Sequence, residues 1–78
     1  MTKYHWDSVL DSTGLLCPLP VLKIRKKLKE MQKGSVLRVI ADDPAAIIDI
    51  PHYCHESGNK ILKQDVGEDG QIYLLMKM

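Results

Sequence analysis

The order of the hydrophobic patterns along the chain constrains its fold more than any other feature. Two segments with helical spacing alternate with strand-like segments. The last two strand-like segments, Lys60 to Val66 and Gln71 to Lys77, are separated only by the short loop Gly67-Glu68-Asp69-Gly70. Helical crossovers join parallel strands, whereas so short a loop makes an antiparallel hairpin. The pattern therefore predicts the order βαβαββ in a single domain spanning residues 1–78.

Two further strands are expected, from Tyr4 to Asp11 and from Ser35 to Ala41. The second and fourth strands ("VLRVIA" and "IYLLM") are apolar on nearly both faces, as central strands are, whereas the first and third alternate with polar residues. These features predict a mixed four-stranded sheet in the order 1-2-4-3, with strand 4 antiparallel. Two helices on one face complete an α/β two-layer sandwich. The other face stays partly apolar and open, which favours a partner or a second copy there.

The first helix is expected from Pro18 to about Gln32, closed by Lys33-Gly34. Its apolar stripe consists of Val21, Ile24, Leu28 and Met31. Its other faces are strongly basic.

The second helix is expected within "ADDPAAIIDIPHYCHESGN". Asp42 or Asp43 can cap this helix, and Pro44 suits its first position. A break or kink is expected near Ile50, because Pro51 lies too far along the segment to start a helix. The residues expected to face inward are Ala45, Ile48 and Tyr53.

Charge and cysteine content exclude several classes of protein. The net charge is +1, so the overall charge indicates neither nucleic-acid nor membrane binding. Two cysteines are too few for a disulfide-dense secreted scaffold. No stretch approaches the ~18–20 apolar residues that span a bilayer, and no signal peptide is visible. The chain is therefore expected in the cytoplasm, with no membrane partner.

The stretch "STGLLCPLPVLKIRKKLKEM" places Cys17 at or next to the start of the first helix. Free N–H groups and a partial positive charge at a helix start favour a thiolate, and cysteine pKa values there fall to about 3.5–7.5. Pro18 and Pro20 fix two first-turn positions and leave only the Leu19 N–H as a capping donor to the sulfur. This predicts an anionic, nucleophilic sulfur, stabilised by the dipole and by Lys23 or Lys26. Packing as a small apolar residue is the plainer alternative.

The residues missing around Cys17 narrow its chemistry. A disulfide oxidoreductase needs a second thiol three residues on, where this chain has Pro20. A cysteine hydrolase needs a histidine base, and no spacing marks His5, His52 or His55 as that base. An activated cysteine without a base or a resolving thiol suits a carrier that accepts a group and surrenders it to another protein.

Cys54 is expected to be buried packing, although a resolving pair with Cys17 stays open. The segment His52-Tyr53-Cys54-His55 has poor zinc-ligand spacing, and no metal site is expected.

The stretch "GLLCPLPVLKIRKKL" resembles the Cys-Pro-x-Pro signature of the TusA/SirA-like sulfur-carrier family. A second block, "ADDPAAIIDIPHYCHESGNKIL", is similar to that family's second conserved region, and the resemblance runs from about Leu10 to Lys77. The family has a two-layer βαβαββ fold related to the C-terminal domain of the third bacterial initiation factor.

This resemblance implies that Cys17 carries a persulfide received from a cysteine desulfurase or a rhodanese. The sulfur would pass to a downstream acceptor protein, for example toward 2-thiouridine in tRNA, with any contact to tRNA indirect. The carrier would need no cofactor, and whether it counts as a sulfurtransferase enzyme stays open. Gly14, Pro18, Pro20, Asp42 and Asp43 are expected to shape the site.

Many relatives place a basic or polar residue before the cysteine, where this chain has Leu16. Leu16 therefore leaves the sulfur without a possible neighbouring cation. This difference affects which sulfur donor or acceptor protein docks, and not the sulfur chemistry itself.

Cations cluster on the first helix. From Pro18 to Ala41 there are seven cations and one acid, whereas Asp42 to Gly58 carries four acids and no Lys or Arg. The expected partner-docking residues are Lys23, Arg25, Lys26 and Lys27. They favour steering of an acidic protein surface. A solvated helix face explains them equally well, and a regulatory module that binds an acidic protein or RNA is the alternative function.

Overall fold

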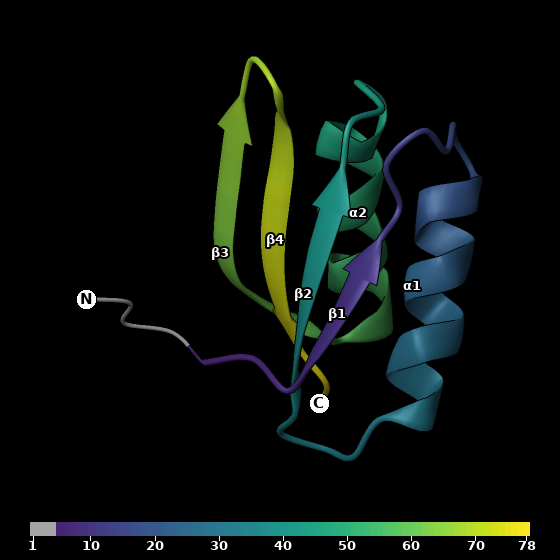
Figure 1. Cartoon of the computed structure of the whole chain (residues 1–78). Coiled ribbons are helices and arrows are strands. Elements are labelled where there is room, and N and C mark those ends of the chain that lie inside the picture. The colour runs from purple at the N-terminus through teal and green to yellow at the C-terminus, as the bar shows by residue number, and fades with distance from the viewer. Residues whose placement is uncertain (1–4) are drawn as a thin grey trace.

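The computed structural model describes residues 5–78, and in this part of the chain the elements follow the order βαβαββ. Their bounds are β1 Ser8–Asp11, α1 Leu19–Glu30, β2 Val36–Ala41, α2 Ala46–Ser57, β3 Lys60–Gly67 and β4 Gly70–Met76. Both helices lie on the same side of the sheet, which confirms the expected two-layer α/β arrangement (Figure 1).

The sheet has the strand order β1-β2-β4-β3, as the sequence predicts. β1 runs parallel to β2, with Ser8 opposite Leu37. β4 lies between β2 and β3 and is antiparallel to both, with Val39 opposite Tyr73 on one side and Gly67 opposite Gly70 at the hairpin. The two most apolar strands are therefore the central ones, each paired with a neighbouring strand along both of its edges.

The core lies between the sheet and the two helices. α1 contributes Ile24 and Leu28, and α2 contributes Ile50 and Cys54, each pair at the i, i+4 spacing of one helix face. The sheet contributes the fully buried Leu37, Val39, Tyr73 and Leu75. A fully buried side chain of this size stabilises the fold by about 1.5–3 kcal/mol, so truncating Ile24 to Ala would cost about 2–5 kcal/mol.

The first strand is shorter than predicted. β1 begins at Ser8, and Tyr4 lies outside the described residues. Asp7 precedes the strand, and its Oδ2 accepts a hydrogen bond from the Val36 N–H at 2.8 Å. The Asp7 side chain thus takes up the Val36 N–H, which a longer β1 would need for a backbone hydrogen bond. Trp6 lies before this point and packs against Arg38, whose guanidinium carbon is 4.9 Å from the ring centroid.

α2 begins later than the sequence indicates, and it runs unbroken past Ile50, where the sequence predicts a break or a kink. The helix starts at Ala46 and continues through Pro51. A turn precedes it, closed by the Ala46 N–H donating to the Asp43 carbonyl at 2.9 Å. This shift also changes the buried face: Ile48 is 74% exposed and was wrongly expected inside, whereas Ala46, Ile50 and Cys54 face the core. Tyr53 is half-buried against the core, as expected.

Candidate functional site

Cys17 is exposed in the loop between β1 and α1, directly before the cap residue Pro18. The Cys17–Pro18 peptide bond is cis. The structure therefore places Cys17 next to the helix start, as predicted. The Leu19 N–H, however, donates to the Leu16 carbonyl at 2.8 Å, so it is not a free donor for the sulfur. A tight turn before the helix uses this N–H, so the one capping donor that the prolines leave is occupied and the sulfur is not capped by it.

Two carboxylates from the end of β2 hold the Cys17 loop. Asp42 Oδ1 accepts a hydrogen bond from the Gly14 N–H at 2.9 Å, and Asp43 Oδ2 accepts one from the Cys17 N–H at 2.8 Å. Gly14 has φ +84°, a left-handed conformation that side chains with a Cβ rarely adopt. Three of the expected site-shaping residues thus meet at the loop that carries Cys17.

Two side chains of β4 hold the backbone of Asp43 in place through hydrogen bonds. The Asp43 carbonyl accepts a hydrogen bond from Gln71 Nε2 at 2.8 Å, and Gln71 Oε1 accepts one from the Tyr73 hydroxyl at 2.6 Å. Gln71 and Tyr73 are buried, so this chain of hydrogen bonds connects the core to the backbone of Cys17. The sequence reading missed both residues. The sequence feature that could have identified them is a single polar residue, Gln71, at the start of an otherwise apolar central strand.

A groove between α1 and α2 opens beside Cys17, with a volume of about 280 Å³. The cap residue Pro18 and Val21 of α1 line one side of it, and the lining from α2 consists of Asp49, His52, Tyr53 and Glu56. His52 Nε2 lies 2.6 Å from Glu56 Oε1. The sequence reading missed these groove residues of α2, although their spacing of three, four and seven residues puts them on one helix face.

The local electrostatics differ from the expectation. The pKa of the Cys17 thiol is raised above its ordinary value of 9.0, first by hydrogen bonding to the Asp49 side chain, then by desolvation and by the negative charges of Asp49 and Asp43. The full negative charges of these two carboxylates outweigh the roughly half charge at a helix end. The predicted anionic resting sulfur is therefore not supported, and neither Lys23 nor Lys26 lines the groove.

The expected docking residues lie along α1. Lys23, Arg25 and Lys26 are exposed, and Lys27 is half-buried. Arg25 lines a second hollow of about 380 Å³ that shares Val21, Tyr53 and Glu56 with the groove at Cys17. The cations therefore adjoin the site without surrounding the sulfur.

Cys54 is 2% exposed and packs in the core, which confirms the packing role. Burial raises the pKa of its thiol to about 11. Both cysteines are free. Within residues 5–78 no three His, Cys, Asp or Glu side chains gather where they could hold a metal ion.

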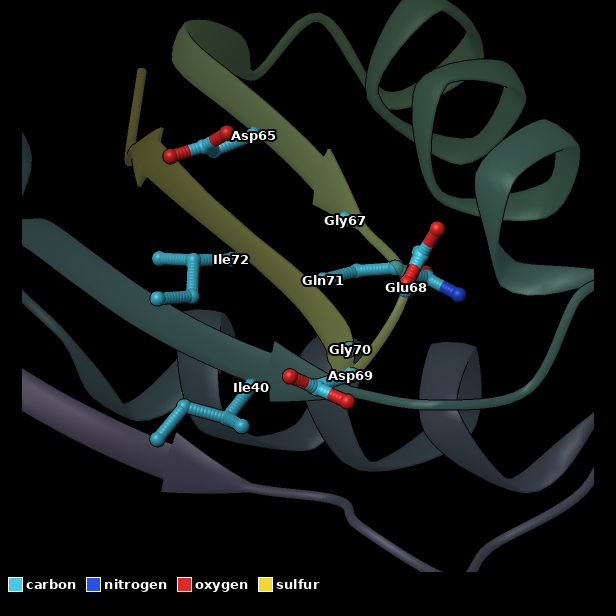
Figure 2. Close-up of a pocket in the computed structure, with 8 residues that line it drawn as sticks. All are labelled: Ile40, Asp65, Gly67, Glu68, Asp69, Gly70, Gln71 and Ile72. Atoms are coloured by element: carbon cyan, nitrogen blue, oxygen red, sulfur yellow. The ribbon is translucent and has the colours of Figure 1, made fainter.

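A further hollow of about 350 Å³ lies at the β3–β4 turn. Ile40, Ile72 and Asp65 form one cross-strand row in it, on the side of the sheet away from the helices (Figure 2). Glu68 and Asp69 add two more carboxylates. None of the predicted site residues lies here.

Comparisons with known proteins agree with this architecture. A family model described as sulfurtransferase TusA matches residues 8–78. The crystal structure of a SirA-like protein from Desulfitobacterium hafniense superimposes with a TM-score of 0.75 and 22% sequence identity, covering 90% of this chain and 95% of that one. At this identity the likeness concerns the fold alone. In the described part of the chain, neither helix has the length and apolar character that crossing a bilayer requires.

Proposed function

Because the chain belongs to the sulfurtransferase TusA family, we propose that it is a sulfur carrier in which Cys17 holds a sulfane sulfur as a persulfide. The observation that carries this proposal is the contrast between the two cysteines. Cys17 is exposed and opens into a groove, whereas Cys54 is sealed in the core. Of the two thiols, only that of Cys17 is thus accessible to a partner protein.

The transfer needs no oxidant or cofactor. The Cys17 thiol gives up its proton, and its sulfur attacks the terminal sulfur of a persulfide on the donor protein. A sulfur–sulfur bond forms at Cys17 while the donor's own sulfur–sulfur bond breaks. The electron pair of the broken bond stays on the donor sulfur, which takes up a proton. Thiol plus persulfide become persulfide plus thiol, and the next transfer, to an acceptor thiol, repeats the same exchange.

The surrounding residues fit this role. Gly14, Asp42 and Asp43 fix the loop backbone, and Pro18 and Pro20 restrict the turn beside the sulfur. A cysteine desulfurase or rhodanese would supply the sulfur, and an acceptor protein would carry it toward products such as 2-thiouridine in tRNA. The cations of α1 would help the partners to dock.

Intact-mass measurement tests the carrier role. The protein is mixed with a cysteine desulfurase and cysteine, and we expect a mass gain of one sulfur atom that is reversed by dithiothreitol. Cys17→Ser should show no gain, and Cys54→Ala should gain as the wild type does. A sulfur adduct that persists in Cys17→Ser, or none in the wild type with any donor, would contradict the proposal.

The exposed cations of α1 favour one alternative function, that of a module that binds an acidic protein or RNA. Salt-sensitive RNA binding without any sulfur adduct would support that alternative.

A further inference from the structure

The groove at Cys17 carries negative charge. Its described lining includes the carboxylates of Asp49 and Glu56, while the Asp43 carboxylate sits behind the Cys17 backbone. His52 is paired with Glu56, and Tyr53 is the remaining titratable group of the lining. Among residues 5–78 no Lys or Arg contributes to this groove. A group that enters it to reach the sulfur therefore meets carboxylates on the α2 side.

The sequence alone points to the opposite sign, because the helix that follows Cys17 is basic. The structure separates the two charges. Asp49 lines the groove at Cys17 and not the neighbouring hollow, whereas Arg25 lines that hollow farther along α1, where it shares Glu56 with the groove. The sulfur and the cations thus occupy different parts of one surface.

We propose that the groove at Cys17 receives a Lys or Arg side chain of the protein that exchanges sulfur with it, and that pairing of this cation with Asp49 frees the Cys17 sulfur to react. The proposal rests on the carrier function. Asp49 acts here as a positioning residue. A carboxylate that accepts the thiol proton in a hydrogen bond favours the protonated sulfur, and an incoming cation reverses that preference. An arginine suits the site especially, since its planar fork can bind a carboxylate through two hydrogen bonds.

The protonation state of the Cys17 thiol in the free protein agrees with this assignment. The raised pKa of the Cys17 thiol indicates a sulfur that is mostly protonated near neutral pH until a partner arrives. An acidic partner loop would instead be repelled by Asp49 and Glu56 at the point of contact.

Two thiol reagents of opposite charge test the sign of the groove. The free protein is treated at low ionic strength with a methanethiosulfonate bearing a trimethylammonium group, and separately with one bearing a sulfonate. We expect the cationic reagent to modify Cys17 several-fold faster, after each rate is divided by its rate with 2-mercaptoethanol. Asp49→Asn should bring the ratio toward one. Glu30→Gln, which removes the same charge at the opposite end of α1 from Cys17, should leave it unchanged.

A faster anionic reagent, or a ratio that Asp49→Asn does not change, would overturn the proposal. Cys17→Ser serves as the blank, and circular dichroism confirms that each variant is folded.

A second measurement separates positioning from mere structural support. With neutral iodoacetamide, Asp49→Asn should react faster at pH 7.5 and show a lower apparent pKa for Cys17. With a cysteine desulfurase as donor, the same variant should load sulfur more slowly, because the docking carboxylate is gone. Equal or faster loading would contradict the role of the cation. Absence of loading in the wild type would instead overturn the carrier function and leave the reagent results standing.

Discussion

At the scale of single residues, Cys17 depends on groups that are distant in the chain. Its backbone N–H is held by Asp43, and it lines the same groove as Asp49 of α2. The loop alone fixes neither contact. Substitutions on the β2–α2 segment should therefore change the chemistry of Cys17 even though they leave its own loop sequence intact.

Asp43→Ala tests the anchor of this loop. The substitution removes the acceptor of the Cys17 N–H and of the Ala45 N–H, which donate at 2.8 and 3.3 Å. We expect the free energy of unfolding to fall by about 1–3 kcal/mol, because partly buried donors lose their partner. Urea denaturation measures the loss, and amide hydrogen exchange at Cys17 should become faster. Asp42→Ala, at an exposed position, is the control and should cost less. Equal losses in the two variants would contradict the anchoring role.

Cys54 should make the fold sensitive to alkali. Burial raises the pKa of its thiol from 9.0 to about 11, so the folded state holds this proton more tightly than the unfolded chain. The stabilisation that Cys54 gives to the folded state is complete below about pH 9 and is lost as the pH rises toward 11. Two pKa units correspond to at most about 2–3 kcal/mol. Urea denaturation between pH 8 and 11 should show this decline in the wild type but a smaller one in Cys54→Ala. Parallel curves for the two proteins would refute it.

At the scale of elements, the start of α2 decides which of its residues reach the site. Cys17 and the two prolines could be identified from the sequence, because their roles follow from local turn and helix chemistry. That chemistry suggested Asp42 and Asp43 only as caps of the second helix, and it was the family resemblance that pointed to them as residues that shape the site. The groove residues could not, since a helix starting at Pro44 and broken near Ile50 presents a different face. The observed start at Ala46 buries Ala46, Ile50 and Cys54 and leaves Asp49 and His52 beside Cys17.

Pro51→Ala examines the cost of keeping that helix continuous. Pro51 lies inside α2 and has no N–H to donate to the carbonyl four residues earlier. Alanine restores this hydrogen bond, so we expect a gain of about 1–2 kcal/mol in the free energy of unfolding, reduced by the freer unfolded chain. Chemical denaturation measures it. Pro44→Ala, in the turn before the helix, should instead lose about 0.4–1 kcal/mol. A loss in Pro51→Ala would show that the ring itself contributes to packing.

At the scale of the whole molecule, the strand order could be predicted because two separate signals agree. The hairpin loop forces β3 and β4 together, and the apolar character of β2 and β4 places both inside the sheet. Charge was harder to predict, since the sign of the surface at Cys17 depends on how α1 and α2 face each other. A matching partner would present a cation opposite Cys17 and acidic groups opposite α1.

The expected contact between α1 and acidic groups of the partner should weaken as the salt concentration rises. We expect Lys23→Gln/Lys26→Gln to lower kcat/KM for sulfur loading by a cysteine desulfurase several-fold at low ionic strength. The difference should vanish near 1 M salt, where the Debye length is about 3 Å. Lys60→Gln/Lys63→Gln, an exposed pair on β3, carries the same change in net charge and should load normally. If both double variants lowered kcat/KM equally, the loss would come from net charge, and the docking role of Lys23 and Lys26 would be contradicted.

The position of β4 affects how the protein is made. β4 leaves the ribosome after the other three strands, yet it is the strand that joins β2 to β3. Until it emerges, β1 and β2 can pair with each other, but β3 has no neighbour in the sheet. A nascent chain whose β4 is still inside the ribosome should thus remain open to proteases, and Cys54, sealed in the finished fold, should be reachable by thiol reagents once it has emerged and until β4 follows and pairs.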